Sequence, residues 1–305
     1  MNILVIGHGF VGEAVCEGMR HGCDITAYDI KKGVIKYSVE SGSSLSSLEI
    51  PPLKEFIVDG LDVIFVCLPT PMNLDGSCNI DIVKKVVCEL DALVGEAGLV
   101  LPVIIKSTVP PGTTRDLNDC CDNLEVMFSP EFLTEANSID DFKSQDRILI
   151  GTASPESMYA EIVSRLFQDT YPDVIQIIAQ PEVMEMVKYI TNCFLATKVS
   201  FANEVYQICK AIGINYEQMI STATMDTRLG KSHWQVPGPM PLDDGSGEPS
   251  LGWGGSCFPK DVNALMCFAD SMGIDTKTLK GAWETNKILR PQKDWEQLKG
   301  RAVVE

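Results

Sequence analysis

One cysteine in the sequence carries the features of a reactive thiol. Cys257 lies in the segment Gly254-Gly255-Ser256-Cys257-Phe258-Pro259-Lys260-Asp261. Proline is typical of the first turn of a helix, so Pro259 predicts that Cys257 stands directly ahead of a helix N-terminus. A helix N-terminus and a neighbouring cation, here Lys260, both favour the thiolate, the nucleophilic form of cysteine. The segment therefore predicts covalent catalysis through the sulfur of Cys257.

The other cysteines lack this setting. The chain has 11 cysteines in total, and none of them is in C-x-x-C spacing. We expect five that lie in apolar runs to be core thiols: Cys16, Cys67, Cys193, Cys209 and Cys267. No signal-peptide pattern precedes the first apolar run, so we expect a cytoplasmic protein with reduced thiols.

Further groups that could do chemistry lie on either side of residue 150. The segment Ser129-Pro130-Glu131-Phe132-Leu133-Thr134-Glu135 places two carboxylates four residues apart. Lys188 and Asn192 are also four apart, and in a helix they would share one face. Two structural readings stay open: Lys188 could pair with Glu185 on its own helix, and Glu131 could cap a helix.

A glycine-rich turn follows the first apolar run. After Asn2–Ile6 comes Gly7-His8-Gly9-Phe10-Val11-Gly12, a G-x-G-x-x-G sequence that leads into a helical pattern. Gly7 would permit a tight turn, Gly9 would let the backbone approach a pyrophosphate, and Gly12 would allow close helix–strand packing. The order of strand, turn and helix predicts a dinucleotide site rather than an ordinary turn.

An acidic residue marks the end of the second predicted strand. Asp29 stands 17 residues after Gly12, where a carboxylate would bind the adenosine ribose and repel a 2′-phosphate. NAD is therefore favoured over NADP, although Lys31 and Lys32 follow closely and leave NADP open. Thr70 and Thr108 lie in two later loops that contain Pro and Thr. These loops could be simple turns, or they could lie at the edge of the cofactor site.

The elements that must position these residues fall into two halves. Short β-branched runs predict strands at 3–6, 25–28, 63–67, 103–106, 126–129 and 148–150. Helical patterns between them, notably at 11–19 and 80–93, predict an α/β fold with a Rossmann-like parallel sheet covered on both faces. After Gly151 the pattern becomes mainly helical, with a long helix from Pro181 to Ile212. We expect an NAD-binding domain at 1–180 and a helical domain at 181–305.

The rest of the helical half is less regular. Residues 230–255 are rich in Gly, Pro and polar residues and predict a long surface loop. Helices are expected at about 260–272 and 276–289, followed by a short charged tail.

Composition excludes several classes of partner. The 25 Lys and Arg against 42 Asp and Glu give a net charge of −17, which opposes binding to nucleic acid or to an anionic membrane. No apolar run approaches the roughly 20 residues of a membrane helix. The three histidines lack zinc-site spacing, so no metal is expected.

Taken together, these segments resemble the UDP-glucose/GDP-mannose dehydrogenase family of nucleotide-sugar dehydrogenases. The resemblance rests on six segments in order: G-x-G-x-x-G at 7–12, Lys-Ser-Thr-Val-Pro at 106–110, Ser-Pro-Glu-Phe-Leu-x-Glu at 129–135, Asn-Cys-Phe-Leu-Ala-Thr-Lys at 192–198, Arg228-Leu229-Gly230, and Gly-Gly-Ser-Cys-Phe-Pro-Lys-Asp at 254–261. The last segment is the most specific.

The resemblance implies a four-electron oxidation at C6 of a nucleotide sugar, using two NAD in sequence. A water near Thr108 and Asp261, together with Lys188 and Asn192, would take up the proton of the first oxidation. Cys257 would then form a thiohemiacetal and a thioester, with Lys188 and Asn192 stabilising the oxyanions. Glu131 would activate the water that hydrolyses the thioester.

The resemblance also implies binding residues and a partner. Substrate phosphates would meet the backbone amides of Phe132-Leu133-Thr134-Glu135 and the loop at Gly254, and Glu135 and Lys260 would also serve the cofactor site. A homodimer would form along the long helix, with Arg228 reaching across it; otherwise Arg228 is a surface salt bridge.

Three departures from the family are visible. Only residues 31–61 separate the acid at Asp29 from the next strand, the 230–252 loop is long, and the family's third, nucleotide-binding domain is not expected in this chain. The substrate expected is UDP-glucose, with GDP-mannose or another nucleotide sugar as rivals. A 3-hydroxyacid dehydrogenase and a non-catalytic NAD- or nucleotide-sugar-binding module are the remaining alternatives.

Overall fold

A computed structural model describes residues 1–38, 42–47, 50–238 and 250–305, and these residues form two compact units. The first unit contains residues 1–70 and 80–188. The second contains residues 71–79 and 189–305. The division therefore falls inside the long helix, and a short segment after Thr70 joins the second unit.

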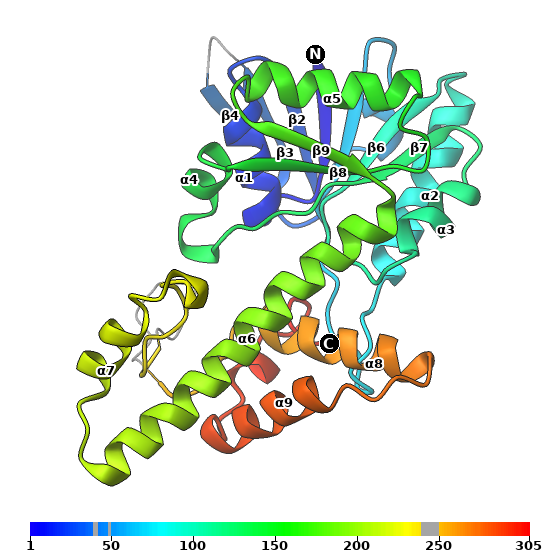
Figure 1. Cartoon of the computed structure of the whole chain (residues 1–305). Helices are drawn as coiled ribbons and strands as arrows, with labels where there is room; N and C mark the ends of the chain where they lie inside the picture. The colour runs from blue at the N-terminus through cyan, green and yellow to red at the C-terminus, as the bar shows by residue number, and fades with distance from the viewer. Residues whose placement is uncertain (39–41, 48–49, 239–249) are drawn as a thin grey trace. The chain divides into compact units, whose positions relative to one another are not determined.

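The first unit is built on one sheet with nine strands among the described residues (Figure 1). Their order is β4-β3-β2-β1-β5-β6-β7-β8-β9. The pairings β2-β1-β5-β6-β7 and β8-β9 are parallel, whereas β2–β3, β3–β4 and β7–β8 are antiparallel. The strands are β1 (Asn2–Ile6), β2 (Asp24–Asp29), β3 (Gly33–Ser38), β4 (Gly42–Ser47), β5 (Val63–Val66), β6 (Leu101–Ile105), β7 (Leu124–Phe128), β8 (Arg147–Gly151) and β9 (Ile175–Ala179).

All six predicted strands are present, and three strands were not predicted. β3 and β4 form an antiparallel pair in the short stretch after Asp29, and Gly33 takes a positive φ of 84° where the chain turns from β2 into β3. β3 alternates weakly between apolar and polar residues and β4 is mostly serine, so neither gives a clear period. β9 is only five residues long and lies at the sheet edge with much of its apolar surface exposed.

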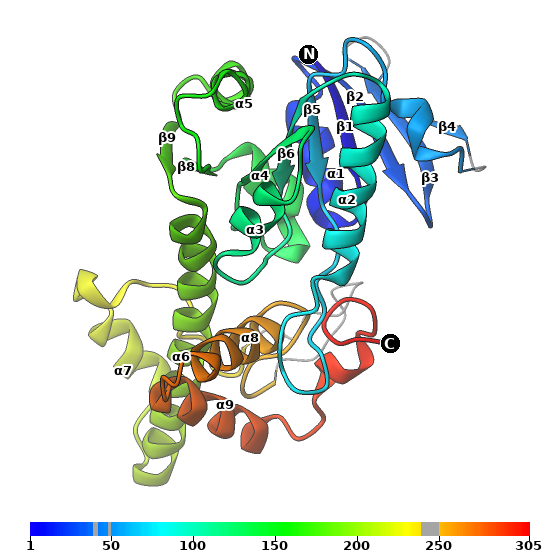
Figure 2. The same ribbon diagram turned by 90° about the vertical axis from the view of Figure 1, so that its right-hand side faces the viewer.

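Helices cover both faces of this sheet, as predicted (Figure 2). One face packs on α1 (Phe10–Met19), α4 (Ser138–Lys143) and α5 (Met158–Thr170). The other packs on α2 (Asp81–Glu96), α3 (Thr113–Asp119) and the 3-10 turn η1 (Leu53–Phe56). Alternate residues of one strand serve opposite cores: Val5 of β1 packs with α1, whereas Leu4 packs with the α2 side.

The second unit is mainly helical. It holds most of α6 (Pro181–Ile212), with α7 (Tyr216–Ala223), η3 (Thr227–Leu229), α8 (Phe258–Ser271), α9 (Lys277–Leu289) and η4 (Asp294–Gln297). α6 has the predicted bounds, and α8 and α9 lie within two residues of theirs. A core of Cys193, Ala196, Trp253, Val262 and Met266 joins α6 to α8.

The predicted charged tail after α9 is wrong, because residues 290–305 are folded. Trp295 is 1% exposed and lies against Trp283, with ring centroids 5.2 Å apart. The chain end also pairs with the 71–79 segment: the amide of Met72 donates to Ala302 O at 2.9 Å, and that of Val304 donates to Met72 O at 3.0 Å. Charged residues dominate this stretch, so its sequence did not indicate that Trp295 anchors it.

The structure describes only part of the predicted loop at 230–255. Residues 239–249 lie outside the described residues, and on either side Gly238 and Ser250 exchange two backbone hydrogen bonds of 3.0 Å. Val236 and Trp253 are buried, so this segment contributes to the core of the second unit. Within the described ranges, no helix has the length and apolar character needed to cross a membrane.

All eleven cysteines are free thiols. Cys16, Cys193 and Cys209 are buried as predicted, and burial raises the pKa of Cys16 and Cys193 above its usual range. Cys67 and Cys267 are half-buried, and Cys67 packs against the core of the first unit. Cys67 follows the carboxyl end of β5, and the Cys267 thiol approaches Asp75 O at 3.3 Å.

Candidate active site

The glycine turn after β1 has the shape that a dinucleotide requires. Gly7 has φ of 91°, and a Cβ there would lie 2.5 Å from Cys67 O. A Cβ on Gly12 would lie 2.0 Å from Gly7 O, so α1 can pack this closely only with glycine. A Cβ on Gly9 would meet nothing within 4 Å. The space beside Gly9, at the start of α1, therefore fits a pyrophosphate.

Asp29 is held at the end of β2 by backbone amides. Its Oδ2 accepts from the amide of His8 at 2.8 Å, and its Oδ1 accepts from Lys31 at 2.8 Å and Lys32 at 2.9 Å. Burial alone would raise the pKa of Asp29, but these three N–H donors lower it below its usual range. The carboxylate is therefore ionised and fixed beside the glycine turn, as NAD recognition requires.

His8 is a residue of this turn that the sequence did not single out. Its side chain is 4% exposed, and Nε2 lies 2.7 Å from Tyr37 Oη on β3. Burial lowers the pKa of His8, so the ring is neutral near pH 7. Nδ1 has no hydrogen-bond partner within the part of the chain described. No sequence signal could place Tyr37 here, because β3 itself was not predicted.

The two threonine loops expected at the cofactor edge are bonded to one another. Thr70 Oγ1 donates to Thr108 O at 2.8 Å, and both side chains are buried. Ser107 Oγ accepts from the amide of Leu68 at 2.9 Å and donates to Leu68 O at 2.7 Å. The loops after β5 and β6 therefore form one layer at the carboxyl ends of their strands, where ligands of such sheets bind.

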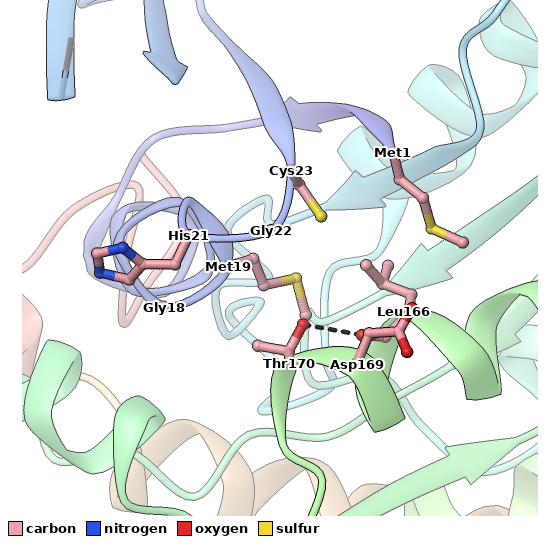
Figure 3. Close-up of a pocket in the computed structure, with 9 residues that line it drawn as sticks. All are labelled: Met1, Gly18, Met19, His21, Gly22, Cys23, Leu166, Asp169 and Thr170. Carbon is pink, nitrogen blue, oxygen red and sulfur yellow. Dashed lines mark hydrogen bonds between the residues drawn. The ribbon is translucent and has the colours of Figure 1, made fainter. Parts of the chain in front are cut away.

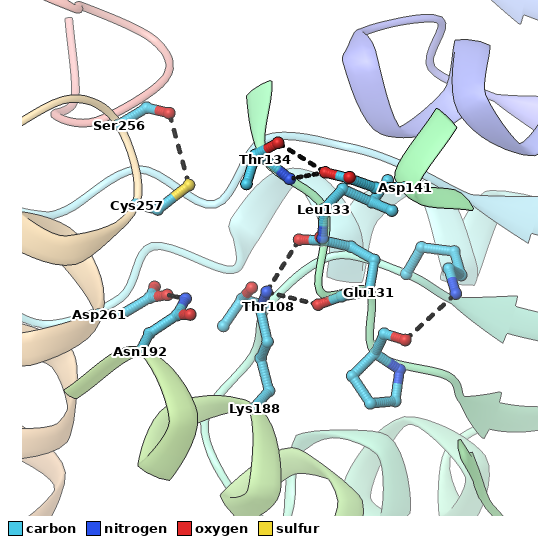
Figure 4. A network of polar contacts seen from close by, with 12 residues as sticks. Thr108, Glu131, Leu133, Thr134, Asp141, Lys188, Asn192, Ser256, Cys257 and Asp261 are labelled. Carbon is cyan, nitrogen blue, oxygen red and sulfur yellow. Dashed lines mark hydrogen bonds and ion pairs between the residues drawn. The ribbon is translucent and has the colours of Figure 1, made fainter. Parts of the chain in front are cut away.

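Lys188 pairs with Glu131, not with Glu185. Lys188 Nζ lies 3.0 Å from Glu131 Oε1 and 2.5 Å from Glu131 O, and both side chains are buried (Figure 4). Glu131 Oε2 accepts from the amide of Leu133 at 2.7 Å. Glu131 lies in an irregular segment after β7 and caps no helix, so both structural alternatives for this pair are wrong.

Glu185 has a different partner, which the sequence did not reveal. It is fully buried and accepts from the amides of Gly112 at 2.6 Å and Thr114 at 2.8 Å. Burial raises the pKa of Glu185, and the two amide donors oppose this. Near it, Arg115 is hydrogen-bonded to Glu182. These contacts fix the first turns of α6 to the start of α3, and so place Lys188 one turn further on.

The amides expected to hold substrate phosphates are partly engaged already. The amide and hydroxyl of Thr134 donate to Asp141 Oδ2 at 2.7 and 2.6 Å, and the amide of Leu133 donates to Glu131 (Figure 4). Carboxylates thus occupy two of the four amides in the segment 132–135. Glu135 is half-buried and begins the short turn η2 (Glu135–Asn137).

In the second unit, Cys257 stands directly ahead of α8. The helix begins at Phe258 with Pro259 in its first turn, and the Cys257 carbonyl accepts from the amide of Asp261 at 3.0 Å. Cys257 is half-buried, and its Sγ lies 3.7 Å from Ser256 Oγ. Helix start and partial exposure are the setting of an activated thiol.

Lys260, Asp261 and Asn192 form a buried network in the same unit. Asp261 Oδ1 accepts from Lys260 Nζ at 2.5 Å. Its Oδ2 accepts from Asn192 Nδ2 at 2.6 Å, as Figure 4 shows. Burial would lower the pKa of Lys260, but Asp261 and the thiols of Cys257 and Cys78 raise it above its usual range. Lys260, three residues after Cys257 in the first turn of α8, therefore stays protonated at neutral pH.

A clamp that the sequence did not reveal holds the loop before Cys257. Asn286 accepts from the amide of Trp253 at 2.7 Å and donates to its carbonyl at 2.9 Å. Asp294 accepts from the amide of Gly255 at 3.0 Å and from buried Arg290 at 2.5 Å. A Cβ on Gly254 would lie 2.4 Å from Asp294, and Gly255 has a positive φ of 73°, so both positions favour glycine.

Arg228 is a surface residue in this chain. Its side chain is 87% exposed, and Nη2 lies 2.5 Å from Asp226 Oδ2. Within one chain it forms the surface salt bridge that was the alternative interpretation. The predicted reach across a dimer stays a prediction.

An exposed apolar stripe runs along α6 within the second unit. Its members are more than half exposed and are spaced by four or seven residues, so they share one helix face. The stripe consists of Ile190, Phe194, Phe201, Ile208 and Ile212. Exposed apolar patches of this kind mark interaction surfaces.

A separate cavity of about 260 Å³ lies in the first unit (Figure 3). It is lined by Met1, Met19, His21, Cys23 and Asp169 among others, near the amino end of β1. None of the predicted site residues lines it. Among the described residues, no group of three or more His, Cys, Asp or Glu side chains could hold a metal ion.

The predicted residues are thus gathered in three places. The first unit brings the glycine turn to Asp29, and separately joins Glu131 to Lys188. The second unit joins Asn192, Asp261 and Lys260 beside Cys257. A Rossmann-type sheet with an ionised acid at its glycine turn, followed by a helical unit, defines a nicotinamide-dependent dehydrogenase.

Comparison with known proteins agrees with this class. The NAD binding domain of the UDP-glucose/GDP-mannose dehydrogenase family matches residues 52–171, and the central domain of that family matches residues 182–288. A UDP-glucose 6-dehydrogenase of Rickettsia prowazekii is 30% identical over 95% of this chain and 68% of its own length. A GDP-mannose 6-dehydrogenase of Pseudomonas syringae is 28% identical over 94% of this chain and 68% of its own.

Solved structures give the same result. A UDP-glucose dehydrogenase from the hyperthermophilic archaeon Pyrobaculum islandicum has a TM-score of 0.77 at 28% identity, over 98% of this chain and 71% of that chain. A 3-hydroxyisobutyrate dehydrogenase of Mycobacterium tuberculosis has a TM-score of 0.69 at 14% identity, over 96% and 94%, which shows the fold alone. The chain belongs to the UDP-glucose/GDP-mannose dehydrogenase family, and its cofactor is NAD.

Proposed function

We propose that the protein oxidises the C6 alcohol of a nucleotide sugar to a carboxylate through a thioester on Cys257. The observation that carries the proposal is the half-buried thiol at the N-terminus of α8, whose first turn also contains the protonated Lys260. NAD, when bound at the glycine turn and Asp29, supplies the hydride acceptor, and two molecules are needed in sequence.

In this proposal Cys257 makes the covalent bond. Its thiolate adds to the C6 aldehyde of the first oxidation and gives a thiohemiacetal. Loss of a second hydride converts that adduct to a thioester, so four electrons leave the sugar in total. The helix N-terminus and Lys260 support the thiolate at neutral pH.

Lys188 and Asn192 stabilise the oxygen anion that forms at C6. Both are buried donors one turn apart on α6, and each is oriented by a carboxylate: Glu131 for Lys188 and Asp261 for Asn192. Preorganised donors of this kind cost no reorganisation during the reaction. A water takes up the proton of the first alcohol oxidation.

Glu131 is the base for the last step. It removes a proton from the water that attacks the thioester carbonyl; the carbon–sulfur bond breaks and Cys257 is released. Its buried position and its two fixed partners, Lys188 and the amide of Leu133, suit a general base that must not move.

UDP-glucose is the substrate we propose, with GDP-mannose as the nearest rival. Relatives named for each of the two substrates have similar identity to this chain, 30% and 28%. Substrate phosphates would bind the amides of 132–135 and the Gly254 loop. Asp141 would then have to release its hydrogen bond to the amide of Thr134.

We also propose a homodimer in which two copies cover the apolar stripe on α6 with each other. A stripe of five exposed apolar residues over 23 positions of one helix suits a second identical helix. Eleven free thiols support a reducing, cytoplasmic location for the protein.

The proposal is tested by counting NADH. Purified protein is given NAD and a panel of UDP- and GDP-sugars, and NADH formed per sugar consumed is measured. We expect two NADH per UDP-glucose, and no second NADH after Cys257→Ala. Cys88→Ala, which removes an exposed thiol on α2, is the matched control and should retain the full yield.

Other outcomes point to the alternatives. One NADH per substrate, unaffected by loss of Cys257, would favour a 3-hydroxyacid type of dehydrogenase. Binding of NAD and nucleotide sugar in a calorimetric titration, with no turnover, would indicate a non-catalytic module.

A further inference from the structure

A buried lysine in the first unit has no part in the chemistry described so far. Lys106 follows β6, and its side chain is 4% exposed. Its Nζ lies 3.2 Å from Ser129 Oγ and 3.4 Å from Pro130 O, with the Phe142 ring centroid 5.8 Å away. Burying an ammonium group lowers the stability of the fold unless neighbouring groups bind it. A lysine buried in this way therefore indicates a specific role.

The two acceptors of Lys106 directly precede Glu131. Residues 129–134 form neither helix nor strand, and Pro130 has no amide hydrogen to donate. The amide of Ser129 donates to Ile105 O of β6 at 3.0 Å, and side-chain contacts add to this single backbone bond. Lys106 binds residues 129 and 130, and Lys188 binds the carbonyl and carboxylate of residue 131. Two lysines from different elements thus fix three successive residues.

The charges around Lys106 agree with this arrangement. Burial lowers the pKa of Lys106 to about 8; the Cys67 thiol and the Glu131 carboxylate oppose the shift, and the Lys188 ammonium adds to it. Lys106 is therefore protonated at neutral pH, beside the bonded pair of Lys188 and Glu131. Lys106 acts on Glu131 through its two neighbours, by way of the Ser129 hydroxyl and the Pro130 carbonyl.

We propose that Lys106 is a positioning residue for the hydrolysis of the Cys257 thioester. By holding Ser129 and Pro130 it keeps the Glu131 carboxylate in place while that group takes a proton from water. In this step the water oxygen bonds to the acyl carbon, the carbon–sulfur bond breaks, and the proton passes to Glu131. The inference rests on the proposed function and concerns only its last step.

The test separates the last step from the earlier ones. Lys106→Met is mixed rapidly with NAD and UDP-glucose, NADH is followed in time, and intact-protein mass spectrometry measures the acyl group on Cys257. We expect a rapid burst of two NADH per site, acyl-enzyme on most sites, and a steady-state rate about 10- to 100-fold below wild type. Lys143→Met, which removes an exposed lysine of α4, should behave as wild type.

A purely structural role for Lys106 would give a different result. The burst and the steady state would then slow together, without acyl-enzyme, and this result or an unchanged rate would overturn the inference. If Lys106→Met does not fold, Ser129→Ala removes one of the two acceptors and should accumulate acyl-enzyme to a smaller extent. A wild-type protein that forms one NADH, or none, would instead overturn the proposed function and this inference with it.

Discussion

Three side chains of the first unit hold protonation states that their surroundings impose. Three backbone N–H groups lower the pKa of Asp29, burial raises that of Glu185, and burial lowers that of Lys106 to about 8. Each of these groups also fixes a segment: Asp29 the glycine turn, Glu185 the start of α3, and Lys106 the residues before Glu131. Their titration is therefore linked to the stability of the fold.

Lys106 should make the stability of the protein depend on pH in a direction that can be measured. The unfolded chain keeps the Lys106 proton to about pH 10.5, whereas the folded chain loses it near pH 8. The unfolded state thus binds more protons between these values, and the free energy of unfolding rises with pH there. At pH 7 Lys106 is protonated in both the folded and the unfolded state, so the buried cation lowers the free energy of unfolding to its full extent.

Lys106→Met removes this dependence. Between pH 7 and pH 9.5 the free energy of unfolding of the wild type should rise by about 2 kcal/mol more than that of the variant, since one pKa unit corresponds to about 1.4 kcal/mol. Urea denaturation under reducing conditions measures both proteins across this range. Parallel curves for the two proteins would show that Lys106 is not a buried cation in the native state.

Asp29 should determine the choice between NAD and NADP. An ionised carboxylate beside the adenosine ribose repels a 2′-phosphate, and Asp29→Asn removes that charge while keeping the shape. We expect the ratio of NAD to NADP affinity, from fluorescence titrations, to fall about 10- to 100-fold. Asp24→Asn, at the opposite end of β2, is the matched control. An unchanged ratio in Asp29→Asn would place cofactor selectivity elsewhere, for example on Lys31 or Lys32.

The active segments are loops, and other elements hold each of them. α6 and Lys106 hold residues 129–131, the end of β2 holds the glycine turn, and α9 with η4 holds the loop before Cys257. The reactive residues thus depend on elements that are distant in the sequence. Chemistry at Cys257 should therefore be sensitive to changes at residues 286–294.

Asn286 tests this dependence most simply. It bonds both the amide and the carbonyl of Trp253, and Asn286→Ala leaves both backbone groups buried without partners. We expect a loss of about 2–4 kcal/mol of unfolding free energy and faster hydrogen exchange at residues 252–257. Thr285→Ala, whose exposed hydroxyl bonds Glu204, should change either quantity little. Equal rates of hydrogen exchange at residues 252–257 in both variants would show that Asn286 does not hold this loop.

The elements with strong periodicity could be predicted, and those without it could not. The long helix α6 has the predicted ends because Pro181 and Gly213 mark them, and the six buried strands were visible as β-branched runs. β3, β4 and β9 gave no clear period. Local spacing also predicted that Lys188 and Asn192 lie on one helix and that Cys257 directly precedes another, whereas Asn286 and Arg290 act across sequence gaps that no local pattern reports.

At the scale of the whole molecule, a net charge of −17 must be compatible with phosphate-bearing ligands. The glycine turn, the start of α1 and a few buried lysines supply local positive potential for this purpose. The acidic surface instead keeps copies apart, so association of two chains must rely on apolar contact. The stripe on α6 is suited to that.

A charge in the stripe should therefore produce a monomer. Ile208 is 59% exposed in the middle of the apolar face, and Ile208→Glu would place a carboxylate between the two copies. Sedimentation velocity should change from dimer to monomer. Ile288→Glu alters an isoleucine of α9 that is 78% exposed and outside the stripe, and it should remain a dimer. A dimer in both variants, or a monomeric wild type, would contradict the proposed interface.

The central claim is that one chain removes four electrons from one carbon through Cys257. The most direct measurement is the number of NADH formed per UDP-glucose consumed, for wild type and for Cys257→Ala at the same protein concentration. Two NADH for wild type, with the second lost in the variant, is the predicted result. One NADH for wild type, or two that persist without the thiol, would contradict it.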